Sequence, residues 1–329
     1  MKTAEFSFNA SGWLQVFQVG VVYFFQHHVK LNTISAVGSS GGATTAAIMV
    51  FDIPADIAAE KICSKEPLVK KDFKSIVKIV HKSIHEMIPI NAMDFLKNNC
   101  LGIVCSEIKN YRNFSETEFK KFTTREDIVE LLCATCHIPS FNGYLPYRYN
   151  GKYLYDGVFT SPHPKKGNKV IYISCTLNCR CGCENNYFTI SPSVEFPLRW
   201  CILSQDRKIL RLIFYHGYCQ TYRKFKEDPN FKKLFKFKNN VVNKKNNDNS
   251  LNTLMNSKIC SNNEELFNLA INNQHKIEFF LSKQIKISNR EWSGCKGYIK
   301  YLYLFVRIFF PCLPIIWCTQ DRILRKHYQ

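Results

Sequence analysis

The chain has 329 residues, which is enough to bury one large hydrophobic core together with a tail or a small second unit. Its 45 lysines and arginines against 26 acidic residues give a net charge of +19, which favours an anionic partner, either a nucleic acid or an anionic membrane surface. The sequence has neither zinc-finger spacing nor a ribonucleoprotein motif, so no nucleic-acid-binding module is identified, and a nucleic-acid-binding protein is kept only as an alternative.

The N-terminus and the cysteines predict a cytoplasmic protein. Residues 1–5 pass directly into strand-like residues, without the apolar segment and cleavage site of a secretory signal. The 15 cysteines are an odd number, and in a reducing compartment free thiols or metal ligands are expected rather than disulfides.

The first fifty residues alternate between strand and helix. A strand at 6–8 is followed by a small-residue turn at 9–12 and an apolar helix at 13–25, and a strand at 33–37 is followed by a helix at 43–50. This order predicts an α/β fold with a mainly parallel sheet and helices on both faces.

The pentapeptide Gly38-Ser39-Ser40-Gly41-Gly42 lies between the second strand and the second helix. It matches Gly-x-Ser-x-Gly in the strand–turn–helix context of a nucleophile elbow. Glycines permit a sharp turn, and the helix directs its N–H groups and positive end toward charge developing at the serine. Ser40 is therefore the predicted nucleophile, and the alternative is a plain Gly/Ser turn.

The middle of the chain supplies further elements. Residues 54–97 carry lysines and apolar residues at helical spacing, which predicts a solvated amphipathic helix, with membrane-surface contact as the alternative. Residues 101–106 and 114–122 are predicted to be extended, and 125–136 a helix that ends before Pro139.

An aromatic strand at 151–158 contains Asp156-Gly157. In isolation this pair favours a tight turn, and the second interpretation is a carboxylate delivered to the end of a sheet strand. Residues 169–175 predict one more strand, as a βαβ scheme requires.

Four thiols follow closely, at Cys175, Cys179, Cys181 and Cys183. Thiolates are good zinc ligands, but the paired Cys-x-x-Cys spacing of a zinc knuckle is missing. No metal site is predicted, and the role of this cluster stays open.

The C-terminal third changes in composition. Residues 238–265 are rich in Asn, Lys and Ser, which predicts a flexible linker. Basic residues at 223–245 favour a solvated, lysine-rich segment over a nucleic-acid contact. The expected organisation is a catalytic domain at 1–235, a linker at 236–265 and a tail at 266–329.

The tail has an apolar run at 298–317 that is interrupted by Arg307 and two prolines. The run is too short for a confident transmembrane helix, which needs about 20 apolar residues. Basic flanks favour a segment that dips into a lipid surface, and the alternative is a buried terminal helix.

Several stretches together resemble the patatin-like phospholipases, and most closely the branch that includes adipose triglyceride lipase. The resemblance spans roughly residues 5–225. It rests on the order and spacing of four segments, which are 6–14 together with 20–21, 38–42, 136–139 and 155–157. It implies a three-layer α/β/α domain and a Ser-Asp dyad without a histidine. By this resemblance Ser40 is the nucleophile and Asp156 the base.

The resemblance also assigns the supporting residues. The oxyanion hole would be formed at Ala10, Ser11 and Gly12, after the first strand. Gly38 and Gly42 would flank the nucleophile in the elbow, and Gly157 would follow the catalytic aspartate.

The resulting prediction is a lipid acyl ester hydrolase, of phospholipase A or triacylglycerol lipase type, that uses no cofactor. Its substrate would be a glycerolipid at a membrane or lipid-droplet surface, where the cytoplasmic protein binds peripherally, and no nucleic-acid partner is expected. Ala10, Gln15 and Val158 depart from the family pattern. They favour the alternative of a weakly active or inactive lipid-surface regulator, and a lipid transacylase is a further alternative. Positional and acyl-chain specificity, oligomeric state and any protein co-activator stay open.

Overall fold

The computed structural model describes residues 4–31, 33–65, 76–110, 113–138, 145–164, 170–176, 188–237, 254–255, 259 and 264–294. The chain divides into two compact units, Met1–Ser282 and Lys283–Gln329. The sheet and the candidate site belong to the first unit.

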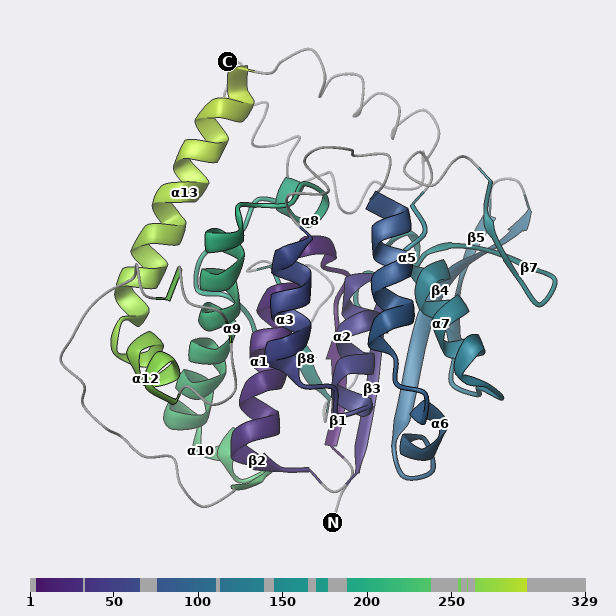
Figure 1. The fold of residues 1–329 in the computed structure, drawn as a ribbon, viewed down its shortest axis with the longest axis horizontal. Coiled ribbons are helices and arrows are strands. Elements are labelled where there is room, and N and C mark those ends of the chain that lie inside the picture. Colours follow the sequence, from purple (N-terminus) through teal and green to yellow (C-terminus); the bar gives the residue numbers. More distant parts are fainter. Residues whose placement is uncertain are drawn as a thin grey trace. The chain divides into compact units, whose positions relative to one another are not determined.

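The centre of the fold is a mostly parallel sheet in the order β6-β7-β4-β3-β1-β8-β9, with β5 paired to β4 (Figure 1). The parallel strands are β1 (Ala4–Phe8), β3 (Ile34–Ser39), β4 (Cys100–Asn110), β8 (Ile171–Ile173) and β9 (Thr189–Ile190). The antiparallel strands at the β4 side are β5 (Asn113–Phe119), β6 (Tyr147–Tyr149) and β7 (Lys152–Asp156). A separate small ribbon pairs β2 (Val29–Lys30) with β10 (Lys236–Phe237).

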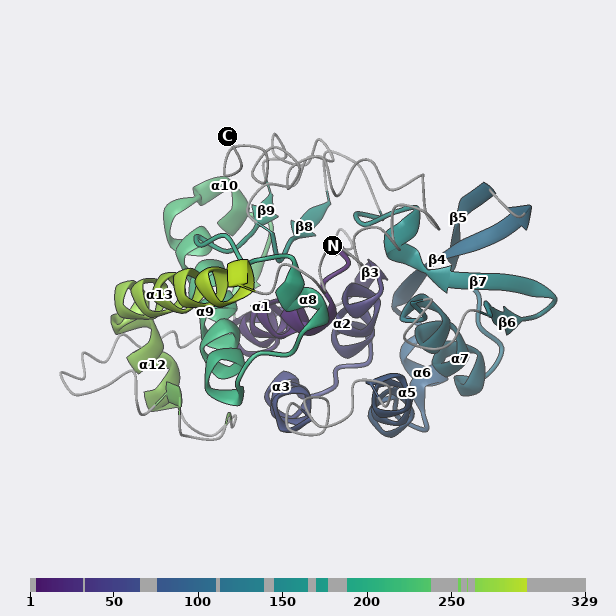
Figure 2. The same ribbon diagram turned by 90° about the horizontal axis from the view of Figure 1, so that it is seen from above.

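Helices flank this sheet. The helices of the described residues are α1 (Gln15–His28), α2 (Gly41–Val50), α3 (Ala55–Ser64), α5 (Ile76–Met87), α6 (Ala92–Phe95), α7 (Arg125–Thr135), α8 (Arg199–Ile202), α9 (Arg207–Glu227), α10 (Pro229–Lys232), α12 (Glu264–Asn272) and α13 (Gln274–Gly294), and α13 contains the division between the two units. Short 3-10 helices occupy Gly12–Leu14 (η1) and Gly157–Phe159 (η3). Figure 2 shows α2 next to the sheet and α3 and α5 outside α2.

Helix α2 and two aromatic residues of β1 lie in the buried core. Helix α2 consists of small and apolar residues and is buried along its whole length, as its place between the sheet and the outer helices requires. The β1 residues Phe6 and Phe8 are fully buried.

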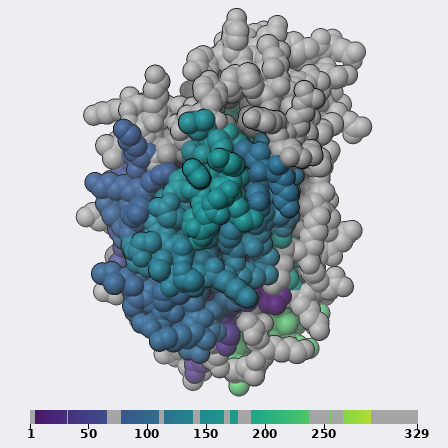
Figure 3. Space-filling model, turned by 90° about the vertical axis from the view of Figure 1, so that its right-hand side faces the viewer, coloured from purple at the N-terminus to yellow at the C-terminus, as the bar shows by residue number. Residues whose placement is uncertain are grey.

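In Figure 3 the face of β5 and β7 is formed mainly by the middle of the chain, blue to teal, and little of the purple N-terminal part reaches it.

A mostly parallel central sheet flanked by helices confirms the predicted three-layer α/β/α class. In the described parts of the stretch 54–97, which are 54–65 and 76–97, the chain forms α3, α5 and α6. The pair Asp156-Gly157 is not a hairpin turn: it ends β7 and begins η3, while the β6–β7 turn is made by Asn150 and Gly151, both at positive φ.

Two observations concern the C-terminal third of the chain, for which the division into domain, linker and tail stays a prediction. Leu254, Met255 and Ile259 lie inside the predicted linker and are buried, because their side chains are apolar and join the first unit. The two units divide after Ser282 rather than within 236–265. The apolar run at 298–317 lies outside the described residues, and none of the helices within the described ranges has the length and apolar character that crossing a membrane demands.

Candidate active site

Ser40 lies between the end of β3 and the start of α2. Its backbone has φ 54° and ψ −131°, a conformation that L-residues rarely adopt. The Ser40 N–H donates to Thr135 Oγ1 at 2.9 Å, which fixes the turn from the α7 side. A strained serine between a strand and a helix is the geometry of a nucleophile elbow.

Glycines at both sides of Ser40 permit this elbow. A Cβ added to Gly42 would lie 2.3 Å from the carbonyl oxygen of Asn9, and one added to Gly38 would lie 2.3 Å from the carbonyl oxygen of Gly42. Real Cβ atoms do not approach carbonyls so closely, so the start of α2 reaches the end of β1 only with glycine here.

Asp156 meets Ser40 from the other side of the elbow. It is the last residue of β7, whose antiparallel pairing places Asp156 opposite Cys105 of β4. The Ser40 hydroxyl donates to Asp156 Oδ2 at 2.7 Å, and the Val158 N–H donates to Oδ1 at 2.9 Å. The structure thus brings together the two residues named as a dyad.

The surroundings of Asp156 change its acidity. The carboxyl group is fully buried, and burial raises its pKa to about 7, although the bonds from Val158 and Ser40 act in the opposite direction. Burial also raises the pKa of Cys136, whose side chain hydrogen-bonds with that of Ser40, so this neighbour is a neutral thiol. A carboxylate with this pKa is a stronger base than a solvated aspartate.

The turn after β1 contains the predicted oxyanion donors, and the N–H of one of them already has an acceptor within the protein. The N–H of Ala10 donates to the carbonyl oxygen of Pro162 at 2.9 Å, so it is occupied. Gly12 has φ +51° and begins η1, and a 3-10 helix leaves its first N–H groups without acceptors in the helix. A Cβ on Gly41 would lie 2.9 Å from Gly12 N and 2.8 Å from Ser11 Oγ, so Ser11 and Gly12 lie against the residue that follows Ser40.

A buried glutamine holds this turn. Gln18 Nε2 donates to the carbonyl oxygen of Asn9 at 2.9 Å and to Asn9 Oδ1 at 2.6 Å, while Ser11 Oγ donates to Gln18 Oε1 at 3.0 Å. Gln18 is fully buried. Gln18 was not predicted from the sequence. Its signal was an amide side chain in the middle of an apolar helix, since buried polar groups need partners.

Two departures from the family pattern have local explanations. Val158 contributes to the site through its backbone N–H, which any residue except proline supplies. Gln15 Oε1 accepts a hydrogen bond from Thr44 Oγ1, and this bond ties α1 to α2.

A cavity of about 160 Å³ opens at the dyad and is mostly apolar. Ser40, Gly41, Gly12 and Asp156 line one part of it. The remaining lining is Trp13, Gln15, Thr44, Ile48, Ala58, Lys61, Ile62, Lys65, Ile79, Val80, Ser83, Ile84, Met87, Cys136, Ile138, Cys201 and Ile202. An apolar cavity with a few precisely placed polar groups is the usual form of a small-molecule binding site.

The cysteine cluster is only partly described. Cys175 is buried, and its backbone N–H donates to Asn9 Oδ1 at 3.0 Å, so it supports the turn after β1. Cys179, Cys181 and Cys183 lie outside the described residues. Within the described ranges, no three His, Cys, Asp or Glu side chains form a group suited to a metal ion.

No family model matches the chain. It is 27% identical over 168 residues to patatin-like phospholipase domain-containing protein 5 of Mus musculus, covering 48% of this chain and 38% of that protein. It is 25% identical over 168 residues to omega-hydroxyceramide transacylase of Mus musculus, and the match covers 48% of this chain and 27% of that protein. It is 22% identical over 247 residues to 1-acylglycerol-3-phosphate O-acyltransferase Pnpla3 of Mus musculus, and the match covers 68% of this chain and 59% of that protein.

The matched regions therefore cover between 27% and 59% of the length of these three relatives. All three matches agree with the resemblance of the motifs to patatin-like phospholipases, and the α/β/α fold is the class that this resemblance implied. The chain is therefore similar to patatin-like phospholipase domain proteins, and these relatives support a patatin-like family.

Proposed function

We propose that the protein is a lipid acyl ester hydrolase in which Ser40 is the nucleophile and Asp156 the base. The observation that carries this proposal is the 2.7 Å hydrogen bond from Ser40 Oγ to Asp156 Oδ2 at the end of an apolar cavity. A nucleophile within hydrogen-bond reach of its base is the arrangement that acyl transfer needs.

The reaction proceeds in two halves. Ser40 Oγ attacks the ester carbonyl carbon while its proton passes to Asp156 Oδ2, and the tetrahedral intermediate expels the alcohol, which takes the proton from Asp156. Water, deprotonated by Asp156, then attacks the acyl-serine carbonyl carbon. The second tetrahedral intermediate expels Ser40 Oγ, which takes the proton back from Asp156, and the fatty acid is released. The N–H groups of Ser11 and Gly12 are the proposed donors to the oxyanion, assisted by the positive end of α2.

The substrate and location follow from the same proposal. A glycerolipid ester at a membrane or lipid-droplet surface would place an acyl chain in the cavity, with the protein cytoplasmic and peripherally bound. The net charge of +19 supports binding to anionic lipid surfaces. We retain residues 1–235 as the proposed hydrolase region and the tail as the lipid-associating part.

A transacylase is the second candidate, because two relatives are named as acyl-transferring enzymes, omega-hydroxyceramide transacylase and 1-acylglycerol-3-phosphate O-acyltransferase. In that case the hydroxyl group of a second lipid, rather than water, attacks the acyl-serine ester. Adding such an alcohol to the assay separates the two, since a transacylase forms the new ester at the expense of free fatty acid.

The pH dependence of hydrolysis tests the role of Asp156. The base must be ionised, and its pKa of about 7 predicts that kcat/KM falls about tenfold per pH unit below pH 7 and levels off above pH 8. An aspartate at its ordinary value near 4 would give a flat profile over the same range.

The measurement is kcat/KM for a soluble short-chain ester between pH 5.5 and 9, with Ser40→Ala as the blank. A flat profile for the wild-type protein would remove Asp156 as the base, provided that circular dichroism shows an unchanged fold over that range.

A further inference from the structure

The charged residues of the cavity are unevenly distributed. Its only carboxylate among the lining residues is Asp156, which is hydrogen-bonded to Ser40 and Val158. Its cations are Lys61 and Lys65, both from the α3 end of the lining. The cavity therefore has the reacting groups at the sheet and two positive charges at an outer helix.

The two lysines lie on one face of α3. Residues four apart in a helix are neighbours on its surface, with their Cβ atoms about 5–6 Å apart. Lys65 directly follows the last residue of the helix as its C-cap. Two ammonium groups on flexible stems at this spacing can contact a single phosphate.

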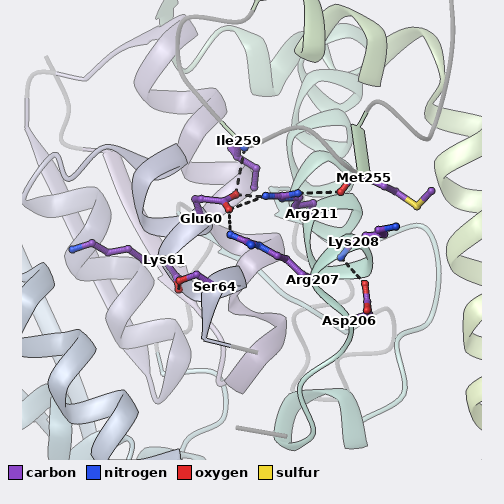
Figure 4. Close-up of polar contacts among 9 residues, drawn as sticks. All are labelled: Glu60, Lys61, Ser64, Asp206, Arg207, Lys208, Arg211, Met255 and Ile259. Atoms are coloured by element: carbon purple, nitrogen blue, oxygen red, sulfur yellow. Dashed lines mark hydrogen bonds and ion pairs between the residues drawn. The ribbon is translucent and has the colours of Figure 1, made fainter. Parts of the chain in front are cut away.

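Glu60, the acidic residue of α3 that directly precedes Lys61, does not neutralise them. Glu60 pairs with Arg207 and with Arg211, at 2.8 Å from Arg211 Nη2, and it accepts the N–H of Ile259 at 3.4 Å. Figure 4 shows Lys61 extending away from this cluster. Although burial acts to raise the pKa of Glu60, the two arginines hold it below its usual range, so its charge is committed to α9.

The opposite wall offers no acid either. The one acidic residue of α5 is Glu86, which lies 3.9 Å from Lys82 in an exposed pair, and neither residue lines the cavity. Among the described residues, no carboxylate lies within 4.0 Å of the Lys61 or Lys65 ammonium group. Like charges four residues apart repel, so this pair is stabilised when an anion joins it.

Besides the lysines and the dyad, the cavity is lined mainly by apolar residues. Ala58 and Ile62 of α3 face Ile79, Val80 and Ile84 of α5 in the cavity lining. A ligand that fills this space with an alkyl chain would present its polar head to the lysines or to Ser40. The cavity is thus built for a chain with an anionic group as well as for an ester.

We propose that Lys61 and Lys65 form a subsite for the phosphate head group of a single-chain lipid, so that the enzyme prefers phosphate-bearing acyl esters over neutral glycerides. This inference rests on the proposed function for its catalytic meaning. Binding of the head group itself needs neither Ser40 nor Asp156, so it can be tested separately.

The test compares two ether lipids that cannot be hydrolysed, 1-O-octylglycerol-3-phosphate and 1-O-octylglycerol, below their micelle-forming concentrations. Titration calorimetry on the full-length protein should show about tenfold tighter binding of the phosphate compound, and this preference should weaken as salt is raised from 0.05 to 0.5 M. In Lys61→Met/Lys65→Met the preference should fall to about one. Lys82→Met, on α5 but outside the cavity, should retain it.

Equal binding of both compounds by the wild-type protein, or an unchanged preference in the double variant, would overturn the proposal. It would also be overturned if the double variant lost binding to vesicles of anionic phospholipid while keeping its preference for the monomeric phosphate compound, because the lysines would then serve the membrane surface. Preference for the phosphate compound in a protein that hydrolyses no ester would reject the proposed function and leave the subsite standing.

Discussion

Asp156→Asn is expected to lower kcat/KM for ester hydrolysis by about 10²–10⁴-fold, the usual contribution of a general base. Asparagine has the same shape and keeps an oxygen for the Val158 N–H, but its amide cannot take the proton of Ser40. The loss should appear at every pH between 6 and 9, because no ionisation restores a base.

The same substitution is expected to stabilise the fold at pH 8. Asp156 has a pKa of about 7 in the folded protein and about 4 when unfolded, so folding favours its protonated form. At a pH above 7 the folded protein must keep a buried carboxylate charged, which costs on the order of 4 kcal/mol of unfolding free energy. Asparagine removes this cost, and the gain should shrink as the pH falls from 7 toward 4.

Denaturant unfolding at pH 8 and pH 5 measures this change. Asp94→Asn is the matched control, because the Asp94 carboxylate is solvent-exposed beside Lys97 and its removal should alter stability by less than about 0.5 kcal/mol. An Asp156→Asn protein that is less stable than wild type at pH 8 would contradict the account of a strained, buried base.

Gly12→Ala is expected to lower kcat/KM by about 10²–10³-fold, the effect of losing one oxyanion donor. An alanine Cβ would lie 1.9 Å from the carbonyl oxygen of Cys201, and φ at this position is +51°. The turn must therefore move away from Ser40, and its N–H groups move with it. A destabilisation of about 1–3 kcal/mol should accompany the loss of activity.

Gly151→Ala separates conformational strain from displacement of the turn. Gly151 also has a positive φ, +75°, but no atom lies within 4 Å of an added Cβ, and it belongs to the β6–β7 hairpin. Alanine there should cost about 1 kcal/mol of stability and leave kcat/KM unchanged. If Gly12→Ala behaved like Gly151→Ala in the kinetic assay, the turn after β1 would not be the oxyanion site.

Local patterns were sufficient to predict the core of the fold. The strand at 6–8, the elbow at 38–42 and the small-residue helix after it each have a short-range signature, and β1, β3 and α2 follow it. The Asp-Gly pair was ambiguous, because the same dipeptide suits a hairpin turn, and only pairing of β7 with β4 places Asp156 at the elbow.

Other parts of the site depend on contacts between distant residues. The Ala10 N–H is occupied by the carbonyl oxygen of Pro162, which lies in a loop more than 150 positions away, so no local pattern could predict this bond. Gln18, Thr135 and Cys136 act through side chains that meet only after folding. The buried residues Leu254 and Met255 lie in a stretch whose overall composition is polar, which concealed their place in the core.

The central claim, that Ser40 is a nucleophile activated by Asp156, is tested most directly by covalent labelling. The full-length protein is treated with a fluorophosphonate at pH 8, and the modified residue is located by peptide mass spectrometry. The account predicts one modified site, Ser40, with labelling abolished in Ser40→Ala and slowed by at least about 10²-fold in Asp156→Asn. Labelling that persists in Ser40→Ala, or that proceeds at the wild-type rate in Asp156→Asn, would contradict it.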